Sequence, residues 1–277
     1  MQRRIPIISL VTTCALFLSA AVPAAPQSAF TPAQTAEIGK IAGDYLLAHP
    51  DILVQVSQQL MVQQAARQQA LSAAKVMEQQ KALLHDADTP VTGPAGASVA
   101  VIEFFDYQCV HCSGMAPDME AVMKASPDVQ FIFKEWPIFA SQWAASEKAA
   151  LRGLDVWRKR GGDGYLAYHT ALYHTGHIEG ALTDADIDAA GQPDRYDTPD
   201  SAASTAALER NDVLAQALGL TGTPGLVVMP VDNVRPEAIT VFAGGCPLKK
   251  FSRLSVKPVR IPESPGHSAA GFTSQTA

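Results

Sequence analysis

The stretch SVAVIEFFDYQCVHCSGMAP, residues 98–117, places an apolar run directly before two cysteines that are separated by two residues. Val99 to Phe105 is apolar, β-branched and aromatic, which is the composition of a buried strand. Beyond the second cysteine, apolar side chains recur at the spacing of one helical face, at Met115, Met119 and Val122. The order of strand, tight turn and helix predicts an α/β fold, with Cys109 at a helix N-terminus.

Three roles are open to Cys109 and Cys112: binding a metal, stapling the fold, or exchanging electrons. A structural zinc site usually needs four Cys or His ligands, and no second Cys-X-X-Cys motif is present to complete one. A stapling disulfide gains from a long closed loop, whereas two intervening residues constrain almost nothing. The spacing therefore favours redox chemistry.

Its place at a helix N-terminus predicts that Cys109 is reactive. Unpaired backbone N–H groups and the helix dipole favour an anion there, and His111, when protonated, adds a nearby positive charge. Such cysteines have a pKa of about 3.5 to 7.5, against about 8.5 for a free thiol. We expect Cys109 to be a thiolate at neutral pH and Cys112, one turn further on, to be the resolving thiol. Pro117 is expected to kink or break the helix.

The segment GLTGTPGLVVMP, residues 219–230, carries a second signal far from the cysteines. Its first proline stands directly before the apolar strand from Leu226 to Met229, a position that tolerates proline only in special geometry. Taken alone, Thr223-Pro224 is more often an ordinary trans turn. Paired with an upstream Cys-X-X-Cys motif on a strand–helix turn, it predicts a cis peptide bond.

These motifs together resemble the DsbA-like thiol:disulfide oxidoreductases of the thioredoxin superfamily. The likeness rests on CVHC at 109–112, VIEFF before it, FIFKEWPIF after it and TGTPG further on, and it covers roughly Val99 to Gly244. It implies a thioredoxin fold that is interrupted by a helical domain. It also implies that Cys109 attacks, that Cys112 is its partner, and that Pro224 is the cis-proline facing them.

The same resemblance assigns three further residues. Thr223 would offer its backbone to an extended substrate peptide beside the disulfide. Glu103, six residues before Cys109, stands where the family has a buried acid linked to proton transfer; the alternative is a salt-bridged strand residue, and Lys134 is a partner under either interpretation. Val110, which we expect to contact substrate, replaces the proline of many strongly oxidising relatives. The direction of electron flow therefore stays open.

Composition limits the other possibilities. The chain has 277 residues, 47% hydrophobic and 17% charged, which describes a globular protein with one good core and spare length for an insertion. A formal net charge of −6 argues against a nucleic-acid partner. Nothing in the middle of the chain is long and apolar enough to span a membrane.

The N-terminus predicts export. Two arginines precede an apolar run from Ile5 to Val22 and the small-residue segment AAVPAAPQS. This pattern indicates a signal peptide, residues 1–24, with an uncleaved membrane anchor as the alternative. A lipid-anchored protein would keep Cys14 as its lipid attachment site, but LVTTC has threonines where a lipobox needs small residues. We therefore expect Cys14 to be removed with the signal peptide. We expect the mature chain in a bacterial periplasm.

Residues 31–84 predict a helical region before the catalytic domain. Thr31 and Pro32 begin a helix that ends near His49, and a second helix is expected from Asp51 to Leu84. A heptad-like seam begins on the second helix at Leu53, Val56 and Leu60, but Gln63 and Arg67 interrupt it. A continuous coiled coil is therefore not expected.

This arrangement resembles ScsC-like exported members of the family, whose N-terminal helices can assemble subunits. One expectation is a homo-oligomer formed through residues 31–84, which would let active sites face one another and favour isomerase activity. The alternative is that these helices pack on their own catalytic domain, which favours simple oxidation or reduction. HDADTPVTGPAGA, residues 85–97, is interpreted as the linker between the two parts.

The thioredoxin-like domain is expected over residues 98–257. Val129 to Phe133 predicts a second strand, and a helical insertion follows at about 141–218. Within the insertion, Thr183 caps a short helix, and a helix from about Asp200 to Leu218 is closed by Gly219. The last two strands, Leu226 to Met229 and Ile239 to Phe242, are predicted to form a hairpin.

Three histidines in the insertion invite a metal hypothesis, namely His169, His174 and His177. We favour surface histidines near a helix end, because no carboxylate or sulfur ligand is obviously placed with them. A metal site is accordingly not predicted there.

The C-terminus departs from the family pattern. A long final helix is expected after Gly244, but the chain offers only a short amphipathic segment, and residues 258–277 are predicted to be disordered. The sheet is therefore expected to be less covered. Cys246 is the odd cysteine, either a free thiol, an intermolecular partner or an accident of an altered terminus.

The sequence predicts an exported protein-disulfide oxidoreductase, acting as oxidase, reductase or isomerase, with no cofactor besides the redox-active disulfide Cys109–Cys112. Its expected partners are cysteine-containing exported proteins and a membrane or periplasmic redox partner. One alternative is a periplasmic copper-binding or metal-handling protein that uses the same cysteines and His111. Another is a scaffold whose N-terminal helices assemble partners.

Overall fold

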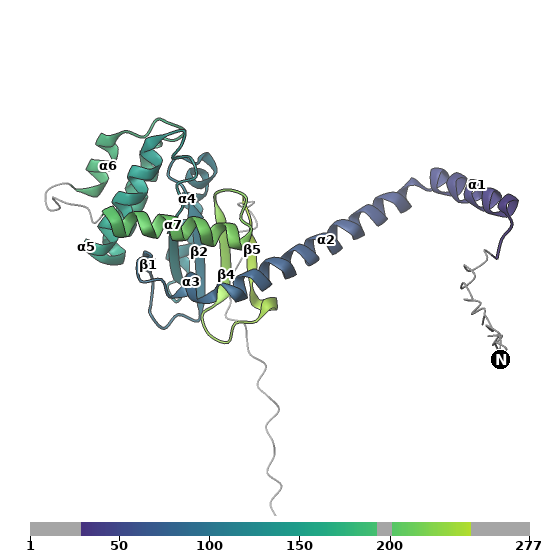
Figure 1. Cartoon of the computed structure of the whole chain (residues 1–277), viewed down its shortest axis with the longest axis horizontal. Helices are drawn as coiled ribbons and strands as arrows, with labels where there is room; N and C mark the ends of the chain where they lie inside the picture. The colour runs from purple at the N-terminus through teal and green to yellow at the C-terminus, as the bar shows by residue number, and fades with distance from the viewer. Residues whose placement is uncertain (1–28, 193–200, 245–277) are drawn as a thin grey trace, which may run out of the picture. The chain divides into compact units, whose positions relative to one another are not determined.

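The computed structural model describes residues 29–192 and 201–244 (Figure 1). The chain divides into two compact units, Met1–Met61 and Val62–Ala277. The interpretations of the signal peptide, Cys14, Cys246 and the tail fall outside the described residues. Within the two described ranges, no helix is both long and apolar enough to cross a bilayer.

In the first unit, helix α1 (Pro32–Ala48) begins where Thr31 and Pro32 predict. The Thr31 hydroxyl accepts the Gln34 N–H at 3.3 Å, and the Gln34 side chain accepts the Thr31 N–H at 2.9 Å, which forms a capping box. The helix ends at His49, and Pro50 begins α2 (Pro50–Glu78). None of the described residues of this unit is buried.

The second unit takes in the last part of the predicted N-terminal region. Helix α2 ends at Glu78 and a short α3 (Gln80–Leu84) follows, so the single predicted helix from Asp51 to Leu84 is wrong at its C-terminal end. Ala73, Val76 and Leu83 are buried among residues of the sheet. This end of region 31–84 therefore belongs to the core of the catalytic unit.

The predicted linker 85–97 is also part of the second unit. It contains strand β1 (Val91–Thr92), which pairs antiparallel with β3. Two residues are too few to show a strand pattern in the sequence, and the interpretation as a linker is wrong for this segment.

The sheet has five strands in the order β1-β3-β2-β4-β5. Strand β2 (Val99–Phe105) forms where it was predicted and lies parallel to β3 (Gln130–Glu135). On its other side β2 pairs antiparallel with β4 (Gly225–Pro230), which pairs antiparallel with β5 (Thr240–Phe242). The predicted α/β architecture and the antiparallel pairing of the last two strands are confirmed.

Each face of the sheet has its own hydrophobic cluster. Side chains alternate along β2, so that Val101 and Phe105 join the first cluster, whereas Ile102 and Phe104 join the second. The first cluster includes residues of α4 (Val110–Ala125) and α5 (Ala144–His174). The second includes residues of the end of α2, of α3 and of α7 (Ser201–Leu218). The described helices thus pack on both faces of the sheet, and the C-terminal segment on which the expectation of a less covered sheet rested lies outside the described residues.

Helix α4 (Val110–Ala125) follows β2 and carries the second cysteine. It continues through Pro117, so the predicted break is wrong. Pro117 is exposed, and Ser113, whose carbonyl loses its helical partner, is half-buried. Met115 and Met119, on either side of Pro117 along the chain, both pack in the first cluster.

The insertion between β3 and β4 consists of α5 (Ala144–His174), α6 (Asp184–Gly191) and α7 (Ser201–Leu218). Gly161, with φ of 66° and ψ of −163°, divides α5 into two helical parts. Thr183 caps α6 with a capping box, as predicted, and Gly219 (φ 73°) follows the end of α7. Helix α7 lies across the sheet (Figure 1), and Leu214, Ala215 and Leu218 join the second cluster.

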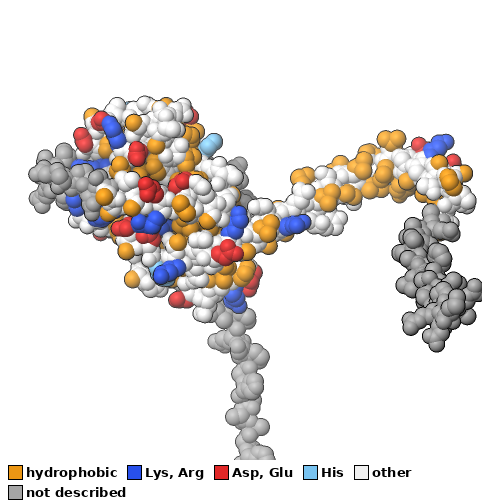
Figure 2. Space-filling view, viewed as in Figure 1, with side chains coloured by type: hydrophobic (Ala, Val, Ile, Leu, Met, Phe, Trp, Pro, Cys, Tyr) orange, Lys and Arg blue, Asp and Glu red, His pale blue; other side chains and the backbone are white. Residues whose placement is uncertain are grey.

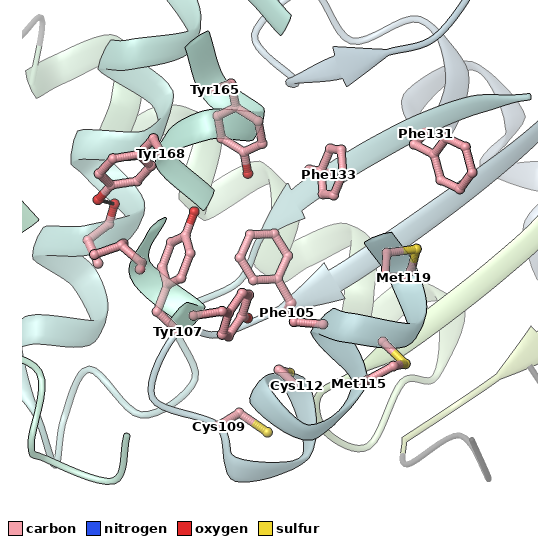
Figure 3. Close-up of a cluster of buried hydrophobic side chains, with 14 of the residues drawn as sticks. Phe105, Tyr107, Cys109, Cys112, Met115, Met119, Phe131, Phe133, Tyr165 and Tyr168 are labelled. Atoms are coloured by element: carbon pink, nitrogen blue, oxygen red, sulfur yellow. Dashed lines mark hydrogen bonds between the residues drawn. The ribbon is translucent and has the colours of Figure 1, made fainter. Parts of the chain in front are cut away.

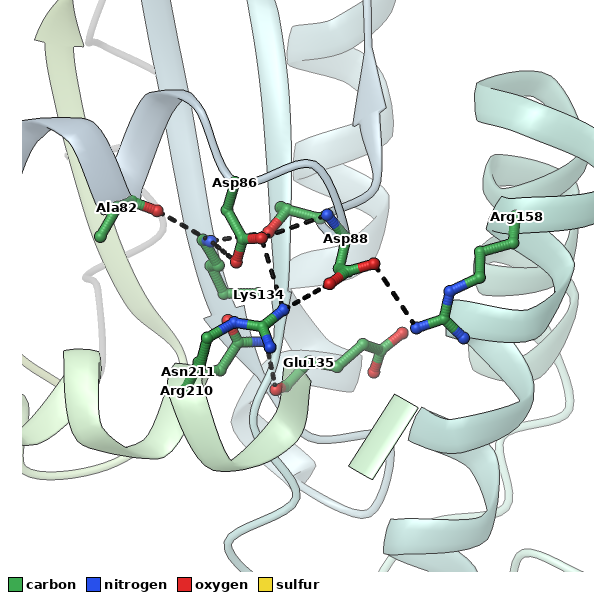
Figure 4. Close-up of polar contacts among 9 residues, drawn as sticks. Ala82, Asp86, Asp88, Lys134, Glu135, Arg158, Arg210 and Asn211 are labelled. Atoms are coloured by element: carbon green, nitrogen blue, oxygen red, sulfur yellow. Dashed lines mark hydrogen bonds and ion pairs between the residues drawn. The ribbon is translucent and has the colours of Figure 1, made fainter. Parts of the chain in front are cut away.

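A buried cation on β3 ties the start of the second unit to the sheet (Figure 4). The Lys134 ammonium donates hydrogen bonds to the Ala82 carbonyl at 3.0 Å, the Thr89 hydroxyl at 2.7 Å and the Asp86 carboxylate at 3.3 Å. Burial lowers the pKa of Lys134, and the Asp86 charge opposes that shift. Arg210 on α7 pairs with Asp86 at 3.5 Å, which extends the network to a helix far along the chain.

Candidate active site

The site begins with the turn that joins β2 to α4. The Cys109 N–H donates to the Asp106 carbonyl at 3.1 Å, closing a turn over residues 106–109. Cys109 is then the N-cap of α4, with extended φ and ψ of −79° and 119°, and its carbonyl accepts the Ser113 N–H at 3.0 Å. The predicted order of strand, turn and helix is confirmed.

The two cysteines are free thiols in different surroundings (Figure 3). Cys109 is 4% exposed and Cys112 is 0% exposed, so that Cys109 is the one nearer to solvent. The pKa of Cys109 is lowered to about 6. Burial, followed by the hydrogen bond to Cys109, raises the pKa of Cys112 well above its ordinary value. One thiol is thus acidic and its neighbour is held protonated.

The low pKa of Cys109 has several causes. The largest is a hydrogen bond with the Cys112 side chain, and the burial of Cys109 opposes it. Thr223 and the backbone N–H groups of Cys112 and His111 lower the pKa further. His111 therefore contributes through its backbone N–H, whereas its imidazole was expected to contribute. The His111 side chain is exposed, as is Val110 beside it, at 42%.

The peptide bond between Thr223 and Pro224 is cis, as predicted. The Cys109 thiol donates to the Thr223 carbonyl, with 3.4 Å between Sγ and oxygen, so the two motifs meet across 114 residues of chain. Thr223 is 6% exposed, and its hydroxyl has no geometrically defined hydrogen-bond partner among the described residues.

Glu103 lies on the same face of the sheet as the first cluster, at 4% exposure. Burial, reinforced by the charge of Cys109, raises its pKa to about 8. Its Oε2 has no hydrogen-bond partner among the described residues. Glu103 is therefore a buried carboxylic acid that keeps its proton at neutral pH.

Lys134, the expected partner of Glu103, lies on the opposite face of the sheet. In the parallel pairing of β2 and β3, Glu103 is opposite Phe133, and Lys134 is opposite Phe104. Neighbouring residues along a strand point to opposite faces, so Lys134 lies on the face of the second cluster and binds Asp86. The expected pairing of Glu103 with Lys134 is wrong.

A second buried acid, which the sequence did not reveal, lies on the same face as Glu103. The Glu135 carboxylate accepts hydrogen bonds from the Tyr165 hydroxyl at 2.7 Å and the Tyr107 hydroxyl at 3.1 Å. Burial raises its pKa well above the ordinary value. Figure 3 shows Tyr107 and Tyr165 in the cluster that also holds the cysteines. The only sequence signal is that Tyr107 stands two residues before Cys109.

The three histidines of the insertion do not converge. His169 is buried at 4% exposure, packs against five aromatic rings and has a pKa lowered by burial to about 3, so its interpretation as a surface histidine is wrong. His174 lies 3.2 Å from Glu120, and His177 lies 2.9 Å from Asp186. No group of three or more His, Cys, Asp or Glu suited to a metal occurs in the described parts of the chain.

Residues 34–67 match the family described as "Copper resistance protein ScsC N-terminal domain", and residues 85–233 match the thioredoxin family. The second match covers more than half of the chain. The chain belongs to the thioredoxin family. This confirms the predicted resemblance to DsbA-like thiol:disulfide oxidoreductases with an ScsC-like N-terminus.

Solved structures of other thioredoxin-family proteins agree. The crystal structure of Salmonella enterica Typhimurium BcfH is 39% identical, with a TM-score of 0.65, and covers 79% of this chain and 93% of its own. Proteus mirabilis ScsC in a transitional conformation is 26% identical, with a TM-score of 0.52, and covers 80% and 94%. A periplasmic thioredoxin-like protein from Salmonella enterica serovar Typhimurium is 26% identical, with a TM-score of 0.51, and covers 62% and 90%. No curated protein matches the chain.

Proposed function

We propose that this thioredoxin-family protein exchanges disulfides with cysteine-containing exported proteins through Cys109 and Cys112. The observation that carries the proposal is the pairing of a Cys109 thiol of pKa about 6 with a buried, protonated Cys112 on one helix turn. A thiolate is the form that attacks a disulfide, and a low pKa also makes it a good leaving group. Both properties are needed at the residue that meets the substrate.

In the oxidising direction, a substrate thiolate attacks Sγ of Cys109 in the Cys109–Cys112 disulfide. The bond between the two enzyme sulfurs breaks, and Cys112 leaves as a thiolate that takes up a proton. A second substrate thiolate then attacks the substrate sulfur of the mixed disulfide, and Cys109 leaves as a thiolate. Two electrons pass from the substrate to the enzyme, and the reverse sequence reduces a substrate.

The surrounding residues take supporting roles in this proposal. Glu103 is a buried acid whose ionised form would raise the pKa of Cys112, and it is suited to exchange the proton that Cys112 gains or loses. Thr223, which bonds Cys109, is placed beside the sulfur where a substrate chain would lie. Pro224 keeps the Thr223 carbonyl at that place, and exposed Val110 offers an apolar contact to substrate.

The direction of electron flow depends on the reduction potential. A stabilised Cys109 thiolate favours the reduced enzyme and hence an oxidising couple. A membrane or periplasmic redox partner must then remove the two electrons that each turnover leaves on the cysteines.

Export to the periplasm is supported by the residues of the predicted signal peptide and by the description of one structural relative as periplasmic. In that compartment a Cys-X-X-Cys pair meets folding proteins whose thiols must be oxidised.

The test is disulfide exchange with a model protein. Reduction of insulin and refolding of a scrambled substrate are measured for the wild type and for Cys109→Ser, which should abolish both activities. Cys112→Ser is the matched variant, since it keeps the attacking thiol but cannot resolve, and it should accumulate mixed disulfides with substrate. Full activity of Cys109→Ser would overturn the proposal.

We also propose that the first unit assembles copies of the chain. Figure 2 shows hydrophobic side chains along α1 and the first part of α2, and none of the described residues up to Met61 is buried. Large apolar side chains there include Ile38, Ile41, Tyr45, Leu47 and Leu60, each between 47% and 81% exposed. Apolar surface of this extent on a helix pair marks an interaction site.

The test of assembly is the mass in solution. Deletion of residues 29–61 spares the buried end of α2 and should convert an oligomer to a monomer, whereas the full mature chain stays associated. Ile41→Asp with Leu47→Asp should have the same effect without shortening the chain. A monomeric mature chain would contradict assembly while leaving the exchange activity untouched.

A further inference from the structure

Gln108, the residue directly before Cys109, is completely buried at 0% exposure, which is unusual for a glutamine. Its side-chain Oε1 accepts the N–H of Gly180 at 2.6 Å, and its backbone carbonyl accepts the N–H of Glu179 at 3.1 Å. One residue of the active-site turn thus holds two successive N–H groups of the loop between α5 and α6.

That loop is fixed in a conformation that leaves it little freedom. Glu179 and Gly180 both have positive φ, 52° and 94°, which aims their two N–H groups at Gln108. A Cβ added at Gly180 would meet the Trp143 ring, with 2.7 Å to Nε1, so the loop is also packed from the other side. Gln108 therefore bonds to a well-defined partner.

The backbone of Gln108 also makes a hydrogen bond within the active-site turn. Its N–H donates to the Asp106 carboxylate at 2.8 Å, and the Asp106 carbonyl accepts the Cys109 N–H at 3.1 Å. The same carboxylate accepts the Ser146 hydroxyl at 2.6 Å at the start of α5. The turn that carries Cys109 is held by the helical insertion at both of these points.

The Gln108 amide is used for one bond only. Its Nε2 has no hydrogen-bond partner among the described residues, although it is buried. A buried amide that leaves its donors unpaired costs free energy, and an apolar side chain of the same length would fill the space without that cost. Methionine has an apolar side chain of similar length to glutamine, so the hydrogen bond from Gly180 is what a substitution of Gln108 by methionine would remove.

We propose that Gln108 is a positioning residue for disulfide exchange, which holds Cys109 against Thr223 by clamping the active-site turn to the loop at Glu179 and Gly180. This inference rests on the proposed function. The Cys109 sulfur lies 3.4 Å from the Thr223 carbonyl. The Cys112 side chain and the backbone N–H groups of Cys112 and His111 stabilise the thiolate, and the turn sets the position of the sulfur relative to them, so a movement of the turn weakens contacts that favour the thiolate.

The experiment measures alkylation of Cys109 by iodoacetamide against pH, in the reduced mature protein that carries Cys246→Ser, with Cys112 protected by its burial. In Gln108→Met, we expect the alkylation rate at pH 6 to fall about three- to fivefold, because less of the thiol is ionised, and the ratio to the wild type to approach one at pH 9. The rate of mixed-disulfide formation should fall in parallel at pH 6.

A second variant perturbs the clamp from the loop. Gly180→Ala adds a Cβ against Trp143 and leaves the Gln108 side chain itself unaltered. It should move the pH profile in the same direction, and the double variant should change it no more than either single variant. Gly180→Ala therefore carries the test even if Gln108→Met fails to fold.

Tyr168→Phe is the control, because it also removes one buried hydrogen bond of the insertion, from the Tyr168 hydroxyl to the Ala149 carbonyl at 2.7 Å. It should lower the unfolding temperature and leave the alkylation profile unchanged. The inference is overturned if folded Gln108→Met and Gly180→Ala keep the wild-type profile and lose stability alone. A wild type that alkylates normally but exchanges no disulfides would instead refute the proposed function.

Discussion

The two faces of the sheet each bury an ionisable side chain, but they differ in whether that side chain has hydrogen-bond partners. Lys134 faces the second cluster and has three hydrogen-bond acceptors, one of them the Asp86 carboxylate. Glu103, from the neighbouring strand, faces the first cluster and the cysteines with one oxygen unpartnered among the described residues. Both groups are buried, but only one is compensated.

This difference suggests a structural role for Lys134 and a chemical role for Glu103. A compensated cation ties α3 and the segment after it to the sheet, and its loss would leave an unpaired buried partner. An uncompensated acid takes a raised pKa and keeps a proton near the place where a thiol must gain or lose one. Substitution of Lys134 should lower the free energy of unfolding, and substitution of Glu103 should change how that free energy depends on pH.

The largest effect should come from Glu103→Gln. The folded-state pKa is about 8, above the ordinary value of 4.5, so the folded protein binds this proton more tightly than the unfolded chain. The stabilisation from that proton is present in full below about pH 4.5 and is lost as the pH rises to about 8. Glutamine cannot ionise, so the variant should gain on the order of 4 kcal/mol over the wild type between pH 5 and pH 8.

Urea unfolding of both proteins at pH 5 and pH 8 measures this effect. Asp106, whose pKa burial also raises, is present in both proteins and cancels in the comparison. The charge of Glu103 contributes to the raised pKa of Glu135, so the measured difference includes that coupling. A stability difference that is the same at both pH values would show that Glu103 is not the proton-holding group of this face.

Lys134→Met should destabilise the protein by about 3 kcal/mol, because it leaves Asp86 and the Ala82 carbonyl without their buried partner. The measurement is again urea unfolding, at pH 7. Lys148→Met is the control, since its ion pair with Asp184 is exposed on both sides, at 56% and 69%, and should change stability by under about 0.5 kcal/mol. Equal losses in the two variants would remove the distinction between the faces.

The sequence predicts this fold well where the signals are local. The composition of Val99 to Phe105 located β2 at its observed bounds, and Gly-Thr-Pro-Gly located the cis bond. Thr31 and Thr183 capped the helices that they were expected to cap. The strand and the two helix caps depend on a few adjacent residues, whereas the cis bond was predicted only by pairing its motif with the upstream Cys-X-X-Cys motif.

The face that a side chain takes is a different problem. Because β2 and β3 are buried on both faces, hydrophobic alternation cannot show that Glu103 and Lys134 diverge. The partners that decide the outcome, Asp86 and Arg210, lie 48 residues before Lys134 and on α7. Gln108 and His169 were likewise missed or misjudged because their burial depends on the insertion.

Gly153→Ala should sharpen the account of the first face. A Cβ there would meet Glu135 Oε1 at 2.6 Å and the Tyr168 ring at 3.2 Å, so we expect a loss of about 2 kcal/mol from overpacking. Gly114→Ala on α4, which meets nothing within 4 Å, should instead gain up to about 1 kcal/mol from helix propensity. Thermal unfolding distinguishes them, and a gain in both variants would mean that the Glu135 site is loosely packed.

Gln69→Leu should give the smallest effect and tests the second face at its edge. The Gln69 amide donates to the Val241 carbonyl at 2.7 Å and accepts the Val241 N–H at 3.3 Å, so α2 supplies edge strand β5 with the bonds that a further strand would make. Because the amide is partly exposed, water can replace both bonds, and the loss should be about 1 kcal/mol. Hydrogen exchange at the Val241 N–H should quicken in Gln69→Leu and not in Gln68→Leu, which alters an exposed neighbour on the same helix. Unchanged exchange in Gln69→Leu would mean that β5 is held by β4 alone, and that the end of α2 covers the sheet only through apolar contacts such as those of Ala73 and Val76.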